Sequence, residues 1–89
     1  MKVLFTDTGW EDYLYWHTAD KEIFSRVNDL INAARRDPFK GLGKPEPLKR
    51  NLAGYWSRRI TGEHRLVYKV EGAKPDQKIT IIQARYHYE

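Results

Sequence analysis

The chain of 89 residues is long enough for one domain with a single core, and its 40% apolar and 31% charged residues are typical of a folded globular protein. It has no cysteine, which excludes disulfides and thiolate metal sites. No apolar run approaches the roughly 18 residues of a membrane span, and no signal-peptide pattern begins at Met1. We therefore expect a soluble, cytoplasmic protein.

The net charge of +4 is distributed unevenly along the chain. Residues 1–34 carry three Lys or Arg against six Asp or Glu, whereas residues 35–69 carry ten against three. Such a basic stretch attracts a polyanion, and nucleic acid is the commonest one in a cell. Aromatic residues lie beside arginines in segments 55–59 and 85–88, as suits stacked bases and phosphates. The alternative is that the charges form a solvated face and the rings pack in the core.

The first predicted elements are a short strand over residues 2–6 and a helix after it. Thr8 and Glu11 match a capping box, in which Thr8 accepts from a free helix amide and Glu11 reaches back. The apolar positions that follow keep helical spacing: Trp10, Tyr13, Leu14 and then His17.

A second helix is predicted to begin near Asp20 and to end at Asp37-Pro38, because proline cannot continue it. Arg35 and Arg36 fall in its last turn, where cations suit the negative end of the helix dipole. Its apolar stripe consists of Ile23, Val27, Leu30, Ile31 and Ala34.

The second half of the chain predicts a loop and three strands. Residues 38–54 contain too many prolines and glycines for a regular element. Strands are predicted over residues 55–60, 64–70 and 78–85, the first two joined by a hairpin turn at residues 61–63. The order β-α-α-β-β-β predicts an α+β fold, in which two helices pack on a mostly antiparallel sheet in one domain spanning residues 1–89.

Few kinds of chemistry fit the residues that are present. The three histidines show no metal-ligand spacing, and the sequence lacks a phosphate-binding glycine loop and a G-x-S-x-G motif. Acid–base chemistry remains possible on a substrate that brings its own nucleophile, as RNA does with its 2′-hydroxyl. RNA cleavage needs a base for that proton, a cation for the charge that develops on the phosphate, and an acid for the leaving oxygen.

Glu46 is a candidate base. It lies between Pro45 and Pro47, which stiffen its backbone, and nearby Lys44 and Lys49 favour its ionised form. The alternative is a loop glutamate that simply pairs with its lysine neighbours.

Arginines and a histidine supply the other roles. Arg58, Arg59 and Arg65 lie on the predicted hairpin, where their guanidinium groups could grip phosphate in bidentate fashion. His87 could act as a general acid near neutral pH, since an unperturbed imidazole titrates at about 6.5. The alternative for His87 is an exposed, idle side chain near the end of the chain.

Five segments carry a more specific signal: DYLYW at residues 12–16, KPEPLK at 44–49, WSRRI at 56–60, EHRLVY at 63–68 and RYHY at 85–88. Together, and in this order, they closely resemble the YoeB (Txe) family of bacterial toxins in the RelE-like superfamily. The resemblance covers essentially the whole chain. It implies a toxin of a type II toxin–antitoxin pair that enters the ribosomal A site and cleaves the mRNA there, without a metal or other cofactor.

The resemblance also implies roles for single residues. By this likeness, Glu46 is the general base, Arg65 stabilises the transition state and His87 is the general acid. Tyr88 helps to position the substrate. Lys49 and Arg59 match basic positions that hold RNA phosphates.

The same resemblance implies partners. They are a YefM/Phd-like antitoxin, the ribosome and its mRNA, operator DNA through the antitoxin complex only, and a second copy of the chain in a homodimer; no membrane is involved. The competing hypothesis is a RelE-like module that binds RNA or an antitoxin without catalysis, against which the presence of Glu46, Arg65 and His87 argues. A repressor that binds DNA alone ranks last, because the sequence has no helix-turn-helix signature.

Overall fold

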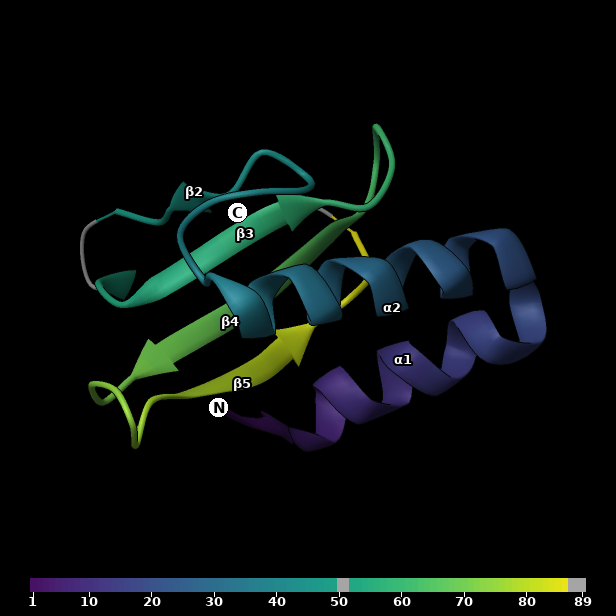
Figure 1. Cartoon of the computed structure of the whole chain (residues 1–89). Coiled ribbons are helices and arrows are strands. Elements are labelled where there is room, and N and C mark those ends of the chain that lie inside the picture. The colour runs from purple at the N-terminus through teal and green to yellow at the C-terminus, as the bar shows by residue number, and fades with distance from the viewer. Residues whose placement is uncertain (50–51, 87–89) are drawn as a thin grey trace.

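The computed structural model describes residues 1–49 and 52–86 of the chain (Figure 1). Its elements in chain order are β1 (Lys2–Phe5), α1 (Asp7–Ala19), α2 (Lys21–Arg36), β2 (Glu46–Pro47), β3 (Tyr55–Arg59), β4 (Arg65–Glu71) and β5 (Lys78–Gln83). The strands form one sheet in the order β1-β5-β4-β3-β2. Only the β1–β5 pair among these strands is parallel. The predicted α+β fold with a mostly antiparallel sheet is therefore confirmed.

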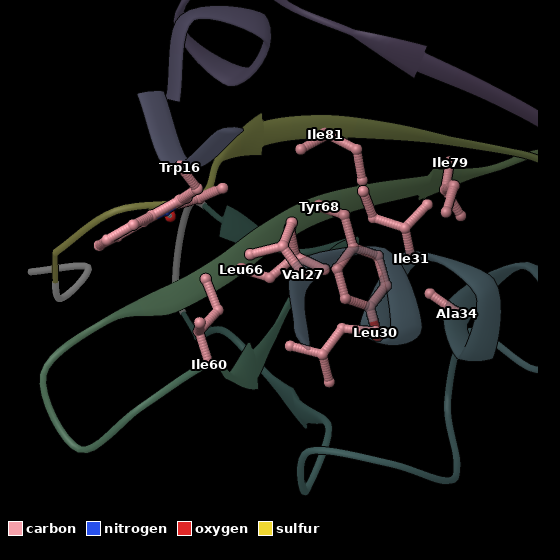
Figure 2. Close-up of a cluster of buried hydrophobic side chains, with 11 residues drawn as sticks. Trp16, Val27, Leu30, Ile31, Ala34, Ile60, Leu66, Tyr68, Ile79 and Ile81 are labelled. Atoms are coloured by element: carbon pink, nitrogen blue, oxygen red, sulfur yellow. Dashed lines mark hydrogen bonds between the residues drawn. The ribbon is translucent and has the colours of Figure 1, made fainter. Parts of the chain in front are cut away.

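Helix α2 supplies much of the core. Asp20 caps its first turn by accepting from the amides of Glu22 and Ile23, and Asp37 ends the helix, as predicted. The predicted apolar stripe faces the sheet, where Val27, Leu30 and Ala34 are fully buried. Figure 2 shows four residues of this stripe, Val27, Leu30, Ile31 and Ala34, against side chains from β4 and β5, namely Leu66, Tyr68, Ile79 and Ile81. Because successive strand residues alternate between faces, those four side chains define the covered face of the sheet.

Helix α1 differs from the sequence prediction at its start and on its buried face. It begins at Asp7, and Thr6, not Thr8, is the cap, accepting from the amide of Gly9 at 3.0 Å. Trp10 and Leu14 are 47% and 45% exposed, so the predicted apolar stripe is only partly buried. The buried residues of α1 are Gly9 and Trp16.

Gly9 explains how closely α1 approaches the sheet. A Cβ atom at this position would stand 2.2 Å from the carbonyl oxygen of Ile81 on β5. Only glycine lets the helix backbone lie at that distance from a strand. The close approach turns the Gly9 face of α1 toward β5 and leaves Trp10 on the surface.

The predicted irregular loop over residues 38–54 contains the short strand β2, which the sequence analysis missed. Glu46 pairs with Ser57 and Pro47 with Trp56, and the amide of Leu48 donates to the carbonyl of Tyr55 at 2.8 Å. Proline is tolerated here because β2 is an edge strand of the sheet. The other strands end within two residues of their predicted bounds.

Candidate functional site

The face of the sheet opposite the helices carries several of the predicted site residues. In the β3–β4 ladder, Arg59 lies directly opposite Arg65. Glu46 on β2 lies opposite Ser57 on β3, two residues from Arg59 along that strand. Opposite residues share a face and strand residues alternate, so Glu46, Arg59 and Arg65 all point away from the helices.

Glu46 and Arg65 share this face without being direct neighbours. Their strands, β2 and β4, are separated by β3, which puts the two backbones about 10 Å apart. Arg59 is diagonal to Glu46, a separation of about 7–8 Å between backbones. The three side chains therefore lie around Ser57 and Val67 on this face, where Val67 is fully buried. Lys49, also exposed, follows β2 at the same edge.

Arg65 is held at the turn between β3 and β4. Its Nη1 donates to the carbonyls of Thr61 at 2.9 Å and His64 at 3.2 Å, and the residue is half-buried. The remaining guanidinium donors include Nη2, so the side chain keeps hydrogen-bonding capacity while its position is fixed. A positioned guanidinium is suited to a bidentate phosphate contact.

The location of Arg58 contradicts its predicted role in phosphate binding. It points to the helix side of the sheet, where it is fully buried. Its Nε donates to the Tyr68 hydroxyl, Nη1 to the carbonyl of Leu42, and Nη2 to the carbonyls of Asp37 and Lys40. Arg58 thus fastens the segment after α2 onto the sheet and has no surface for RNA. Strand alternation, applied to neighbours 58 and 59, would have separated their roles.

Tyr68 completes this buried arrangement. Its hydroxyl accepts from Arg58 and donates to the carbonyl of Pro38. Burial raises the pKa of the Tyr68 phenol above its ordinary value of 10.0, although the hydrogen bond and the positive charge of Arg58 act in the opposite direction. The phenol accordingly stays neutral and serves as a structural hydrogen-bond partner.

The segment after β5 is fastened beside Arg65. The amide of Arg65 donates to the carbonyl of Tyr86 at 3.1 Å. Helix α1 holds the preceding residue Ala84, whose carbonyl accepts from the Trp16 indole at 2.7 Å and whose amide donates to Asp12 at 3.0 Å. These roles of Asp12 and Trp16 were not predicted, although both residues lie in the DYLYW segment. The predicted residues His87 and Tyr88 lie outside the described residues.

Other parts of the described surface do not coincide with these residues. A concavity of about 550 Å³ lies between the end of α2 and the segment after it, lined in part by Arg36, Lys40 and Leu42. In residues 1–49 and 52–86 no three His, Asp or Glu side chains come together as a metal site would require. Neither described helix is long and apolar enough to cross a membrane.

The chain is similar to known bacterial toxins over nearly its whole length. A model of the YoeB-like toxin of bacterial type II toxin–antitoxin systems matches residues 5–88. The chain belongs to this family. Toxin YoeB from Streptomyces coelicolor is 56% identical over 88 residues, which cover 99% of this chain and 100% of that protein. Toxin YoeB from Escherichia coli K12 is 54% identical with the same coverage. This YoeB-family chain is thus a toxin of the type II toxin–antitoxin class.

Solved structures agree with the family. The YoeB/ParE toxin from Agrobacterium tumefaciens matches with a TM-score of 0.92 and 53% identity, covering 99% of this chain and 100% of that one. A YoeB dimer from Staphylococcus aureus matches at 0.86 and 43% identity, covering 99% of this chain and 98% of that one. A YoeB–YefM complex from the same organism matches at 0.84 and 42% identity with the same coverage. The Escherichia coli toxin YafQ, at 15% identity and a TM-score of 0.75, shares the fold alone.

Proposed function

We propose that this YoeB-family chain is a ribosome-dependent endoribonuclease that cleaves mRNA in the ribosomal A site and so inhibits translation. The observation that carries the proposal is the gathering of Glu46, Arg59 and Arg65 on the sheet face that α1 and α2 leave free. Tyr86, the residue before His87 in the sequence, lies beside Arg65, whose amide donates to the Tyr86 carbonyl. A candidate base and two cations thus lie on one face of the sheet.

The proposed reaction uses the RNA's own hydroxyl group. Glu46 takes the proton of the 2′-hydroxyl, whose oxygen attacks the adjacent phosphorus. Arg65 stabilises the added negative charge on the phosphoryl oxygens. The bond from phosphorus to the 5′-oxygen breaks, and His87 donates a proton to that oxygen. The products are a 2′,3′-cyclic phosphate and a 5′-hydroxyl, and no metal or cofactor is required because RNA supplies the nucleophile.

The other residues in the proposal bind substrate. Lys49 and Arg59 contact RNA phosphates, and Tyr88 helps to position the substrate. The exposure of Lys49 and Arg59 supports these contacts. Arg58 is left out, because it is fully buried and its donors are occupied by three backbone carbonyls and a phenol.

The proposed partners follow from the family. A YefM/Phd-like antitoxin would neutralise the toxin by laying a flexible acidic segment over the basic face, and the pair would bind operator DNA. The toxin itself would form a homodimer and act on ribosomes in the bacterial cytoplasm. Support comes from the Staphylococcus aureus relatives, one solved as a YoeB dimer and one in complex with YefM.

The deciding experiment is cell-free bacterial translation of a defined mRNA, with 5′ ends mapped by primer extension. We expect wild-type protein to produce cuts at ribosome-occupied codons. Glu46→Ala and His87→Ala should each reduce the cleavage rate by about 100- to 10,000-fold, the usual contribution of one acid–base group. Glu22→Gln, which changes an exposed carboxylate on α2, is the matched control and should cleave normally.

Two results would contradict the proposal. Inhibition of translation without any cuts would make this a non-catalytic binding module. Cleavage that survives in the Glu46 or His87 variant would remove that residue from the mechanism.

A further inference from the structure

The turn between β3 and β4 presents a histidine side chain to the segment that follows β5. The Nδ1 atom of His64 lies 2.8 Å from the amide nitrogen of Tyr86 and accepts its hydrogen. The next residue, Arg65, donates its own amide to the Tyr86 carbonyl. Two consecutive residues of the turn therefore bond both polar backbone groups of Tyr86.

This contact fixes the protonation pattern of the imidazole. A backbone amide can only donate, so Nδ1 must carry a free lone pair and the ring proton must sit on Nε2. Nε2 lies 3.3 Å from a carboxylate oxygen of Glu63, which can accept that proton's hydrogen bond. Glu63 is 74% exposed, so this outer contact orients the ring and adds little energy.

The ring is held in place by more than these two contacts. It is 13% exposed, and its edge meets the Trp16 indole at 4.8 Å between centroids. The turn beneath it is closed by hydrogen bonds, because the His64 amide donates to the Thr61 hydroxyl and its carbonyl accepts from the Ile60 and Thr61 amides. The imidazole is thus a rigid acceptor on a rigid turn.

Tyr86 itself has an unusual backbone conformation that such an acceptor helps to maintain. Its φ angle is +63°, in the left-handed region that bulky residues seldom adopt. A residue stays there only when its surroundings hold it. The bonds to His64 and Arg65 meet that need, since they hold the amide and the carbonyl on either side of the Tyr86 Cα atom.

We infer that His64 is a positioning residue, whose Nδ1 acceptor, with the Arg65 amide, holds Tyr86 in its left-handed conformation beside Arg65. This inference rests on the proposed function in one respect, that His87 is the general acid. His64 touches no substrate in this scheme and acts through Tyr86. It ties Tyr86, the residue before His87 in the sequence, to the same turn that holds the Arg65 guanidinium.

Two substitutions separate the acceptor from the bulk of the ring. In His64→Asn, the side-chain oxygen can occupy the place of Nδ1 and still accept from Tyr86. In His64→Gln, the oxygen corresponds to Nε2 and lies one bond farther out. The acceptor role therefore predicts that asparagine rescues and glutamine does not, whereas a role in packing alone would favour glutamine, the larger side chain. His17→Gln, on α1 against Phe24, is the matched histidine control.

The first readout needs no ribosome. Hydrogen exchange of the Tyr86 amide, followed by NMR on the free protein, should be slow in wild type and His64→Asn and at least about tenfold faster in His64→Gln. Nitrogen chemical shifts of wild-type His64 should show a proton on Nε2 and none on Nδ1. Equal Tyr86 exchange in all folded variants would overturn the inference. A proton on Nδ1 in wild type at neutral pH would also overturn it, even if a variant failed to fold.

The second readout is single-turnover cleavage of ribosome-bound mRNA. We expect His64→Gln to lower the cleavage rate by about 100-fold, the effect of a small misplacement of a catalytic group, with ribosome affinity unchanged. Absence of cleavage by wild type would refute the proposed function and leave the exchange result as the test of the Tyr86 contact. Normal cleavage by His64→Gln alongside fast Tyr86 exchange would overturn the positioning role.

Discussion

Arg58 and Arg59 are adjacent arginines in one sequence motif, yet their side chains lie in different environments. Arg58 is buried and bonds three backbone carbonyls and a phenol, whereas Arg59 is exposed on the opposite face. The charge and spacing in the sequence are compatible with phosphate binding by both. What separates them is the pleat of β3, which sends neighbouring side chains to opposite faces. At the scale of single residues, a motif is therefore informative only once each residue's face is known.

Tyr68→Phe tests how far the buried Arg58 arrangement stabilises the fold. It leaves Arg58 Nε and the Pro38 carbonyl without their partner, which should lower the free energy of unfolding by about 1–3 kcal/mol at neutral pH. Urea denaturation measures this change. Tyr55→Phe, on the face of β3 opposite the helices, is the matched control.

The same substitution predicts a pH dependence. Because burial raises the Tyr68 pKa above 10.0, the folded state keeps the phenol proton where the unfolded state loses it. Its contribution to wild-type stability is complete below about pH 10 and falls as the pH rises further toward the folded-state pKa. The stability difference between wild type and Tyr68→Phe should shrink over that range. A difference that stays constant from pH 8 to pH 11 would contradict the expected pKa shift.

At the scale of elements, the local sequence pattern predicted most helices and strands, but it did not predict the contacts between them. The apolar stripe and Asp20 cap of α2 are local features, and both were predicted. Strand β2 was not, because two residues beside prolines carry no periodic signal and are ordered by pairing with β3. The approach of α1 at Gly9, and the path of the segment after β5, likewise depend on distant contacts. The shared face of Glu46, Arg59 and Arg65 needed the ladder register, which the sequence does not contain.

The start of α1 offers a matched pair of threonines. Thr6 Oγ1 accepts from the Gly9 amide and also lies at hydrogen-bond distance from the Ile81 and Ile82 carbonyls, so it ties the helix to β5. Thr6→Ala should lower the free energy of unfolding by about 0.5–2 kcal/mol, as loss of a helix cap does. Thr8→Ala, at an exposed position inside the helix, should change it by less than about 0.5 kcal/mol. Thermal or urea denaturation compares the two variants. An equal effect of both substitutions would favour the predicted capping box at Thr8 over the Thr6 cap.

At the scale of the whole molecule, both surfaces of the sheet carry cations, and the face opposite the helices also carries Glu46 and Glu71. The open face, by which we mean the sheet face opposite the helices, carries Arg59, Arg65 and Lys69, with Lys49 at its edge. The helix side includes α2, whose first turn is acidic and whose last turn is basic. The +7 stretch counted over residues 35–69 therefore overstates the charge available to RNA, since Arg58 is buried within it. The proposed ribosome contact depends on where the exposed cations lie.

Salt dependence tests that contact directly. If the open face contacts ribosomal RNA and mRNA, the affinity of the toxin for ribosomes should fall steeply as salt rises, because each phosphate contact releases condensed counterions. Replacing Lys49 or Arg59 by Gln should reduce the slope of log affinity against log salt by about 1 for each lost phosphate contact. Arg36→Gln, at the end of α2 beside the 550 Å³ concavity, is the matched control and should leave the slope unchanged. A slope that responds to Arg36 and not to Arg59 would move the contact to the helix side, away from Glu46 and Arg65, and the proposed catalytic face would then lack its means of docking.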